Sequence, residues 1–400
     1  MNISLIGLQL GDEGKGKIID FLSNYSDINI RYNGGHNAGH IIYIKNIKKK
    51  VRVLPSAIFK KKCLCLISNN IILSLRNFIH EVKNVIFNNL IISKECNIIN
   101  NFDELIDFYI DKINKIGTTY NGISVFYLRK YIKISFSIFN SINLNFIKII
   151  KKNIFFYNLY FIFFKIKIKI NLFFFICIIK YNIFFFKKII VNNIFFTNNK
   201  YNKIFESSQG TMLDLNYGYF PFVTCSNIIN KSIYIDSEFY LNNIKFITIL
   251  KIYTSKVGNG FFLTKFKNKK NFFFSLLTKE FGTNSLKIRK CGWNDFYHIK
   301  EMIKINNISN LILTKLDILY FLKYLKILIY YKINNKCFNY KKNFVYKKKF
   351  IKFNSWKKIN KKYFLNELNL HLYIKFYEIC LNTPITIISI GKFEHDLILL

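Results

Sequence analysis

Glycine is scarce in this chain, and its distribution restricts the possible fold more than any other sequence feature. Only 16 of the 400 residues are glycine and only 3 are proline. Even so, the first 39 residues hold Gly7, Gly11, Gly14, Gly16, Gly34, Gly35 and Gly39. Because glycine permits tight turns and a close approach of the backbone to a ligand, the N-terminal segment is predicted to hold functional loops.

The first glycine group lies between a short apolar segment and a helix-forming one. Residues 3–7 are predicted to form a strand, and residues 9–17 a turn that leads into a helix. Such a turn exposes backbone N–H groups to an anion, and Lys15 and Lys17 add positive charge suited to phosphate. The segment GDEGKGK at 11–17 lacks the spacing and the final Ser or Thr of the Walker pattern. Taken alone, it is also compatible with an ordinary tight turn.

A second glycine group, RYNGGHNAGH at 31–40, follows another apolar segment. The carboxyl ends of neighbouring parallel strands share one crevice, so Asp12 and His40 are predicted to face each other across a phosphate site. One would act as a base and the other as an acid, and Asp12 could also hold Mg²⁺. A lone histidine is more often structural, but His40 follows a glycine at a loop end, where side chains can point toward a ligand.

The formal net charge of +39 is extreme, and such an excess commonly indicates binding to nucleic acid or to an anionic membrane surface. Here the lysines are scattered among Asn, Ile, Phe and Tyr along the chain, which favours a chain-wide compositional drift. A basic RNA-binding protein is kept as the alternative from another functional class. The most apolar tract, residues 153–179, is interrupted by Lys165, Lys167 and Lys169, so it lacks the roughly 20 apolar residues of a membrane span.

The eight cysteines form no C-x-x-C pair and show no Cys–His spacing typical of zinc sites. Scattered free thiols fit a reducing compartment, and the residues after Met1 do not resemble a secretory signal. We therefore expect a cytoplasmic protein. Neither a repeat period nor a Pro-rich or Gly/Ser-rich linker divides the chain, so we expect a single domain over residues 1–400.

The two opening segments, GLQLGDEGKGKIID and RYNGGHNAGH, resemble the opening motifs of the adenylosuccinate synthetase family. Similar segments follow in the family order: IGTT at 116–119, FESSQGTMLDLNYGYFPFVTCSN at 205–227, YTSKVGNG at 253–260, EFGTNSLKIRKCGW at 280–293, LTKLD at 313–317 and ISIG at 388–391. Because these segments are spread from one end of the chain to the other, the resemblance concerns the whole chain.

The resemblance implies an α/β fold with a large, mostly parallel central sheet flanked by helices, a P-loop-NTPase-like GTP-binding core and smaller subdomain excursions. It also implies GTP-dependent ligation of L-aspartate to IMP through 6-phosphoryl-IMP, which gives adenylosuccinate, GDP and phosphate. This reaction is the first committed step of AMP biosynthesis from IMP. The implied partners are IMP, L-aspartate and GTP as co-substrate, with one Mg²⁺ per subunit and a homodimer that shares its active sites. Neither a membrane nor a specific nucleic acid is expected as a partner.

The same resemblance gives each candidate site residue a role. The implied catalytic residues are Asp12 as base, His40 as acid, Lys15 and Gln209, with Mg²⁺ held by Asp12 and the carbonyl of Gly39. The residues implied in nucleotide and metal binding are Gly11, Asp12, Glu13, Gly14, Lys15, Gly16, Lys17, Gly39, His40, Ile41, Arg289, Lys315, Leu316, Asp317, Ser389, Ile390 and Gly391. Those implied in IMP or aspartate binding are Asn37, Ala38, Thr119, Lys133, Gln209, Thr224, Thr283, Asn284, Ser285, Lys287 and Arg289.

Several binding positions depart from the family pattern. Lysine stands in place of arginine at Lys133, Lys256 and Lys287, and an ammonium cannot form the bidentate contact with a carboxylate that a guanidinium makes. These changes leave open a decayed homologue that binds nucleotide or IMP with little turnover. Residues 134–203 fall where the family is largely helical, yet they are rich in β-branched and aromatic residues. In that region, local propensity and the implied fold disagree.

Overall fold

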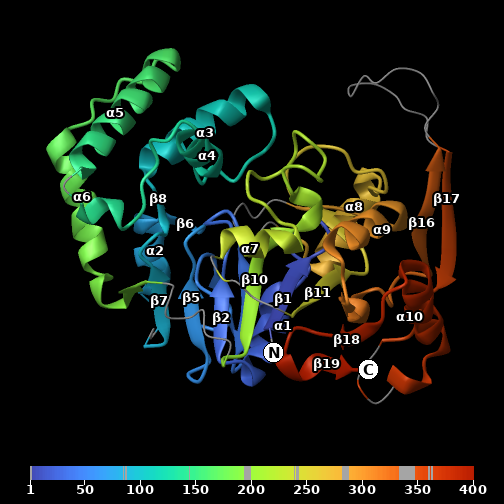
Figure 1. The fold of residues 1–400 in the computed structure, drawn as a ribbon. Helices are drawn as coiled ribbons and strands as arrows, with labels where there is room; N and C mark the ends of the chain where they lie inside the picture. Colours follow the sequence, from blue (N-terminus) through green and yellow to red (C-terminus); the bar gives the residue numbers. More distant parts are fainter. Residues whose placement is uncertain are drawn as a thin grey trace.

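The computed structural model describes residues 2–83, 85, 88–143, 145–192, 200–237, 239, 243–281, 288–332, 347–358, 361 and 364–400. These residues form a central sheet with helices around it, and the chain crosses the sheet repeatedly (Figure 1). Parallel pairing predominates, and only the last strand of this sheet runs antiparallel to its neighbour. The predicted α/β class with a mostly parallel sheet is therefore confirmed.

The ten described strands of the central sheet stand in the order β19-β18-β15-β11-β1-β10-β2-β5-β7-β9. Their bounds are β1 Asn2–Gly7, β2 Ile28–Arg31, β5 Leu64–Ile67, β7 Leu90–Ser93, β9 Ile190–Val191, β10 Lys203–Gly210, β11 Ile244–Lys251, β15 Asn310–Thr314, β18 Ile385–Ser389 and β19 Leu397–Leu399. From β1 the chain builds one side of the sheet as far as β9, and after β10 it builds the other side. The direction of winding therefore changes near β1 and β10, the place where α/β sheets bind ligands.

Smaller sheets carry the excursions from this centre. A hairpin joins β3 (His40–Ile44) to β4 (Ile47–Val51), and β6 (Ile72–Ser74) pairs with β8 (Asn97–Ile99). Farther along the chain, β12 (Thr254–Lys256) pairs with β13 (Lys290–Gly292). A third group consists of β14 (Asn294–Asp295), β16 (Tyr324–Lys332) and β17 (Lys347–Asn354).

The described α-helices are α1 Lys15–Leu22, α2 Leu75–Val82, α3 Asn101–Asn114, α4 Ile123–Tyr131, α5 Phe146–Phe163, α6 Leu172–Phe184, α7 Ile233–Asp236, α8 Asn268–Thr278, α9 Phe296–Asn306 and α10 Leu368–Leu381. The predicted strand, glycine turn and helix at the N-terminus are confirmed by β1 and α1. Five of the six residues of β1 are buried, as expected for a central strand covered on both faces.

Within the described part of residues 134–203, the chain forms the two helices α5 and α6 (Figure 1) and the short strand β9. Periodicity explains this result, because Phe146, Ile150, Asn153 and Tyr157 recur at helical spacing and are buried on one face of α5. In α6, Phe175, Ile179 and Ile183 do the same. None of the helices in the described part of the chain combines the length and the apolar character that a membrane crossing requires.

Two apolar cores lie on the two sides of the winding change. One joins β5 and β7 to α2, α5 and α6, and the other joins β11, β15 and β18 to α8, α9 and α10. Because both cores are built on one continuous sheet, loops that start from distant parts of the sequence end along a common edge. That edge carries most of the predicted site residues.

Candidate active site

Most of the predicted site residues lie where five strands end, β1, β2, β10, β15 and β18, and β11 stands between β1 and β15 in the same sheet. Register places Gly7 of β1 beside Gly210 of β10, and Glu206 of β10 beside Arg31 of β2. On the other side, Thr314 of β15 pairs with Lys251 of β11 and with Ser389 of β18. The glycine loop, the RYNGGHNAGH segment, Gln209, Lys315 and Gly391 therefore all lie at the carboxyl edge of one sheet.

The side chain of Glu13 holds the backbone of the glycine loop in place. Its buried carboxylate accepts hydrogen bonds from the backbone N–H groups of Gln9 and Gly11, at 3.2 and 2.8 Å, and pairs with the Lys15 ammonium at 2.8 Å. Burial raises the pKa of the Glu13 carboxyl, but the Lys15 charge and the hydrogen bonds from Lys15 and the backbone together hold the pKa below its ordinary value. A Cβ atom on Gly7 would lie 2.2 Å from this carboxylate, which explains the glycine there. In the free protein, Lys15 therefore belongs to the loop's own ionic network.

Asp12 is part of the glycine loop, and its backbone has a left-handed conformation with a φ of 62°. Its carboxylate accepts a hydrogen bond from Arg289 Nη2 at 2.7 Å, and its side chain is 26% exposed. The same guanidinium donates through Nη1 to Glu280, which also binds Lys251 Nζ, each at 2.7 Å. Arg289 thus links the exposed carboxylate of Asp12 to the buried carboxylate of Glu280.

His40 lies in a separate buried network. Its Nδ1 is 2.6 Å from Glu206 Oε1 and 3.2 Å from Ser56 Oγ, and the Arg31 guanidinium lies 3.1 Å from the same ring nitrogen. Burial and the Arg31 charge lower the pKa of His40 to about 4, although Glu206 opposes them. The His40 ring is therefore neutral at pH 7 in the free protein. The His40 side chain also borders the glycine loop, since a Cβ on Gly16 would lie 3.0 Å from His40 Cβ.

The last two strand ends meet Lys17 of α1. Its ammonium donates to Ser389 Oγ and to the Gly391 carbonyl, both at 2.9 Å. Burial lowers the pKa of Lys17 to about 8, and the charges of Asp396 and Asp317 oppose this shift. Asp317 has an Oδ1 atom that is buried and has no hydrogen-bond partner among the described residues. A buried carboxylate oxygen of this kind is available to a ligand donor.

The opposite part of the edge shows the same kind of unpaired atoms. Asn37 Oδ1, Ser208 Oγ and Gln209 Oε1 are buried without a hydrogen-bond partner in the described part of the chain. Thr224 is half-buried, and Thr119 is exposed at the end of the segment after α3. Because buried polar atoms in folded proteins are normally paired, the unpaired amide oxygens of Asn37, in the loop after β2, and Gln209, near the end of β10, indicate a place for a polar ligand.

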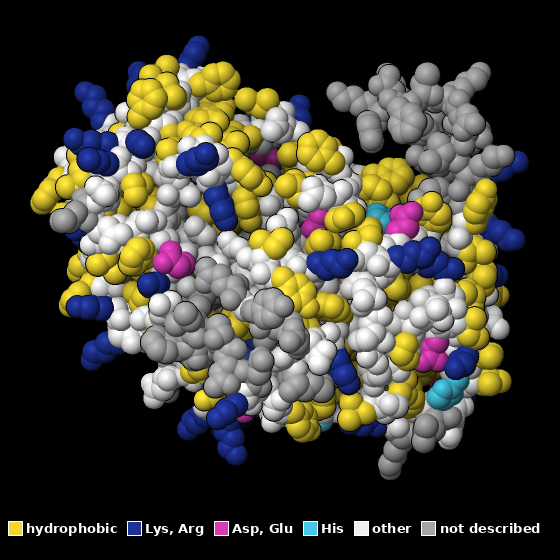
Figure 2. Space-filling model, viewed as in Figure 1, with side chains coloured by type: hydrophobic (Ala, Val, Ile, Leu, Met, Phe, Trp, Pro, Cys, Tyr) yellow, Lys and Arg dark blue, Asp and Glu magenta, His cyan; other side chains and the backbone are white. Residues whose placement is uncertain are grey.

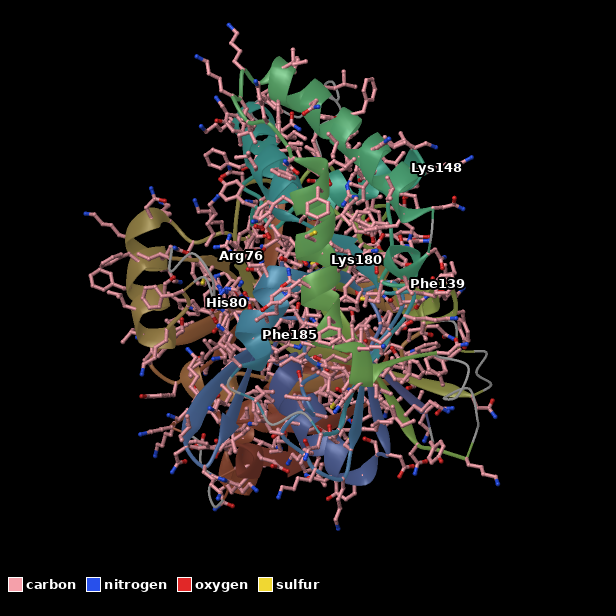
Figure 3. The ribbon with its side chains drawn as sticks, turned by 90° about the vertical axis from the view of Figure 1, so that its left-hand side faces the viewer. Arg76, His80, Phe139, Lys148, Lys180 and Phe185 are labelled. Atoms are coloured by element: carbon pink, nitrogen blue, oxygen red, sulfur yellow. The ribbon has the colours of Figure 1, made fainter. Side chains whose placement is uncertain are left out.

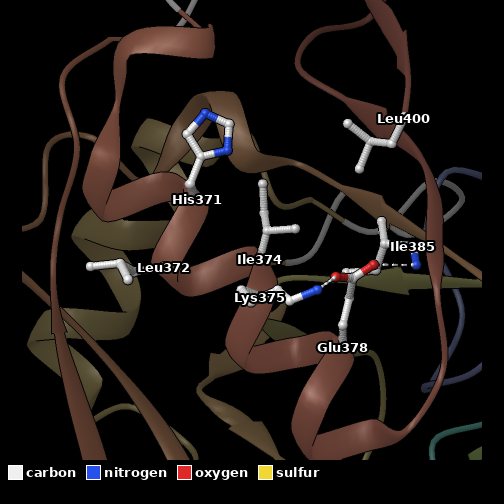
Figure 4. Close-up of a pocket in the computed structure, with 7 residues that line it drawn as sticks. All are labelled: His371, Leu372, Ile374, Lys375, Glu378, Ile385 and Leu400. Carbon is white, nitrogen blue, oxygen red and sulfur yellow. Dashed lines mark hydrogen bonds and ion pairs between the residues drawn. The ribbon is translucent and has the colours of Figure 1, made fainter.

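The pocket drawn in Figure 4 lies elsewhere. It has a volume of about 560 Å³ and is lined by His371, Leu372, Ile374, Lys375, Glu378, Ile385 and Leu400. Ile385 begins β18, so this pocket is at the amino end of a strand whose carboxyl end carries Ser389. The pocket is therefore separate from the edge that gathers the predicted residues.

Comparison with known proteins settles which family has this arrangement. Residues 4–398 match the family model described as adenylosuccinate synthetase. The chain belongs to the adenylosuccinate synthetase family. Over 334 residues it is 34% identical to the adenylosuccinate synthetase of Buchnera aphidicola, and the match covers 80% of this chain and 78% of the relative. An Ehrlichia ruminantium adenylosuccinate synthetase is 32% identical over 361 residues, covering 85% of this chain and 82% of the relative.

Solved structures agree with the sequence comparison. The fully ligated adenylosuccinate synthetase from Plasmodium falciparum matches with a TM-score of 0.89 and 27% identity, over 100% of this chain and 99% of that chain. A succinoaminodeoxyadenylate synthetase of cyanophage S-2L shares the fold, with a TM-score of 0.64 and 10% identity. The chain is thus a ligase that forms a C–N bond, joining aspartate to IMP with GTP as co-substrate in AMP biosynthesis.

The remaining predicted site residues lie in different parts of the structure. Ala38, Gly39 and Ile41 lie on the loop and strand that carry His40, and Leu316 and Ile390 are buried beside Asp317 and Ser389 along the chain. Lys133 is exposed in a left-handed turn just after α4. Thr283, Asn284, Ser285 and Lys287 lie outside the described residues.

Sequence reasoning missed the buried carboxylates that hold the predicted side chains. Glu206 binds His40, and Glu280 binds Arg289. A usable signal existed, because only 22 of the 400 residues are acidic. In so basic a chain, an acidic residue next to a glycine-rich or aromatic motif is informative, and Glu206 and Glu280 both lie inside the family-like segments.

Proposed function

We propose that the carboxyl edge of the central sheet is the synthetase active site, with Asp12 as base and His40 as acid. The observation that carries this proposal is the meeting of five strand ends where buried polar atoms lack partners. On this assignment Asp12 takes the N1 proton of IMP, and the purine 6-oxygen attacks the γ-phosphorus of GTP and expels GDP. The aspartate amine then attacks C6, and phosphate leaves.

In this proposal the ion pair with Arg289 decides whether the Asp12 carboxylate can accept the proton from IMP. In the free protein the Arg289 guanidinium pairs with the Asp12 carboxylate at 2.7 Å, so this carboxylate oxygen is already occupied by a donor. Arg289 also has the geometry to bind a phosphate or a carboxylate of a substrate. Substrate binding would draw the guanidinium toward the added negative charge and free Asp12. Glu280 keeps Arg289 at the site during this exchange, because its ion pair is buried.

His40 needs a proton that the free protein does not give it at neutral pH. Its pKa is lowered to about 4 by burial and by the Arg31 charge. Negative charge from bound phosphates would oppose Arg31 and raise this pKa, so His40 would become the acid only in the substrate complex. Glu206 fixes the orientation of the ring, since its carboxylate lies 2.6 Å from Nδ1.

The guanine of GTP is assigned to the edge formed by Lys17, Asp317 and Ser389. A carboxylate at Asp317 can accept hydrogen bonds from guanine N1 and N2, which adenine cannot provide. The unpaired Oδ1 atom of Asp317 supports this role. Asn37, Gln209, Thr119 and Thr224 are assigned to IMP on the opposite part of the edge.

The residues present fit one Mg²⁺ ion. The Asp12 carboxylate is partly exposed, and the Gly39 carbonyl belongs to the adjacent loop, so both offer the hard oxygen ligands that Mg²⁺ prefers. Among the described residues there is no group of three or more His, Cys, Asp or Glu side chains that would build an all-protein site. This favours an ion held by few protein ligands together with substrate phosphates. When bound, Mg²⁺ would stabilise negative charge on the phosphate oxygens.

We also propose a cytoplasmic homodimer in which the whole chain acts as one catalytic domain. Large apolar side chains are exposed on α5 and α6, including Phe155, Ile162 and Phe173 at 67%, 76% and 78%. Figure 3 shows this face, with Lys180 on α6 and Phe185 just after it. A patch of this kind indicates an interface. Lys133, exposed at the end of α4, is assigned to the IMP phosphate of the partner subunit.

The test is formation of adenylosuccinate and GDP from IMP, GTP and aspartate with Mg²⁺. Wild type should turn over, whereas Asp12→Asn and His40→Asn should each lose at least about 100-fold in kcat, as expected for a general base or acid. Asp27→Asn is the matched control, because Asp27 is exposed just before β2, at the opposite edge of the sheet. A folded wild type without turnover would support the decayed-homologue alternative, and variants with full activity would refute the assigned roles.

A further inference from the structure

The turn at residues 257–260, called here the platform turn, touches two loops that the proposed function assigns to IMP. It follows β12, and its glycines Gly258 and Gly260 have left-handed backbones with φ of 80° and 106°. The two loops are residues 116–120, which carry Thr119, and residues 222–224, which carry Thr224. About a hundred residues of sequence separate the two loops. Only the folded chain therefore brings both of them into contact with the same turn.

The contact with the first threonine loop is a close fit between two glycines. A Cβ on Gly117 would lie 3.2 Å from Gly258 Cα, so neither backbone leaves room for a side chain between them. Asn259 then holds the loop by two hydrogen bonds, from its backbone N–H to the Ile116 carbonyl at 3.2 Å and from Nδ2 to the Lys115 carbonyl at 2.9 Å. From the far side, Asp111 accepts the Gly117 N–H at 2.9 Å.

The contact with the second threonine loop is aromatic. A Cβ on Gly260 would lie 2.4 Å from the ring of Phe222, two residues before Thr224. The ammonium of Lys256, which is buried, lies 5.4 Å from the centroid of the same ring. Thr224 itself is fixed by a hydrogen bond from its N–H to the Leu213 carbonyl at 2.8 Å. The platform turn therefore borders both threonine loops.

Lys290 fastens the platform turn to the strand that follows Arg289. Its ammonium donates to the Gly258 carbonyl at 2.8 Å and to Asn259 Oδ1 at 3.3 Å. Lys290 and Lys256 are direct partners in the β12–β13 pair. Asn259 thus lies between two partners, because its amide donates to Lys115 and its carbonyl oxygen accepts from Lys290.

We propose that the platform turn positions both threonine loops for IMP, with Asn259 and Lys290 as positioning residues. This rests on the proposed assignment of Thr119 and Thr224 to IMP. Loss of either side chain removes part of the hydrogen bonding that holds the first threonine loop against the platform turn, so IMP must order that loop further on binding. The GTP edge at Lys17, Asp317 and Ser389 starts from other strands. IMP affinity should therefore change while GTP use stays constant.

The experiment compares Asn259→Ala and Lys290→Met with wild type in steady-state kinetics, and measures IMP binding directly by titration calorimetry. Loss of one or two hydrogen bonds should raise the KM and Kd for IMP about tenfold. The KM for GTP and kcat at saturating IMP should stay within about twofold. Lys290→Arg keeps a cationic donor and should restore IMP binding. Asn268→Ala and Lys269→Met are matched controls, because both residues are exposed on α8.

The outcomes separate this proposal from the proposed function. If wild type binds IMP but makes no adenylosuccinate, the assigned chemistry fails, and the calorimetric comparison still tests the platform turn. Unchanged IMP affinity in Asn259→Ala would overturn the positioning role. An equal rise in the KM for GTP would also overturn it, since that pattern indicates general loss of structure. A wild type that does not bind IMP would refute both.

Discussion

Replacing Glu280 with glutamine should destabilise the protein by about 3 kcal/mol, because removal of one partner from a buried ion pair costs about 3–5 kcal/mol. The Glu280 carboxylate is 2% exposed and pairs with Lys251 and Arg289 at 2.7 Å each. It also accepts the Tyr253 hydroxyl at 2.6 Å. The glutamine amide oxygen can keep one of these bonds, so the lower end of the range applies. This loss is large against a typical folding stability of about 5–15 kcal/mol.

The same substitution should change how stability depends on pH. Burial raises the pKa of the Glu280 carboxyl, but the charges of Lys251, Arg289 and Lys315 outweigh burial and hold the pKa below its ordinary value of 4.5. A carboxyl with a lowered folded-state pKa contributes stability that is fully present above about pH 4.5 and is lost as pH falls through the folded value. The gap between wild type and Glu280→Gln should therefore be constant at neutral pH and narrow below about pH 4.5.

Urea unfolding followed by tryptophan fluorescence between pH 4 and pH 8 measures both effects. Glu301→Gln is the control, because Glu301 is exposed on α9 and its loss should leave the free energy of unfolding nearly unchanged. If Glu280→Gln is as stable as wild type at pH 7, the buried ion pairs do not stabilise this region. A gap that widens on acidification would show that the sign of the pKa shift is wrong.

Other predictions concern single side chains of the site. The pKa of His40 is lowered to about 4, so between about pH 6.5 and pH 4 the unfolded chain binds a proton that the folded chain does not. The free energy of unfolding should therefore decrease as the pH is lowered from about 6.5 to 4. His40→Asn should show a shallower fall in the same urea titration. Asp317→Asn should lower kcat/KM for GTP about 10–100-fold and reduce the preference for GTP over ITP, because a hydrogen bond to a charged group is worth about 1.5–3 kcal/mol. Gly7→Ala should reduce the urea midpoint strongly, since the new Cβ would lie 2.2 Å from Glu13.

Local motifs made the strand ends predictable from sequence. The glycine loop could be predicted from neighbouring residues alone, because a short apolar segment followed by closely spaced glycines indicates a strand, a turn and the helix after it. The structure places β1 and α1 at those positions. The catalytic roles of Asp12 and His40 remain predictions, because they depend on substrate geometry.

Interactions between distant segments were not predictable in the same way. Glu206 lies 175 residues from Arg31, and Glu280 binds an arginine that also reaches back to Asp12. No local pattern encodes such pairs, because they arise only when the sheet brings separate strand ends together. In residues 134–203, β-branched and aromatic propensity suggested strands, but helical spacing of the buried residues prevailed. Packing against α2, α3 and the β5–β7 core decided the outcome there.

The distribution of arginine explains how so lysine-rich a surface coexists with an ordered site. Figure 2 shows lysines and arginines spread over the visible face among apolar side chains, where a simple charge is sufficient. Three arginines are instead buried against carboxylates: Arg31 with Glu206, Arg129 with Asp103, and Arg289 with Glu280 and Asp12. Arg129 donates two parallel bonds to one carboxylate, and Arg289 bridges two carboxylates. A guanidinium offers several donors in a rigid plane, whereas an ammonium is a point charge. Arginine therefore stands where several donors must be held in one plane, whereas the buried lysines Lys15 and Lys251 each bring a single charge to a carboxylate.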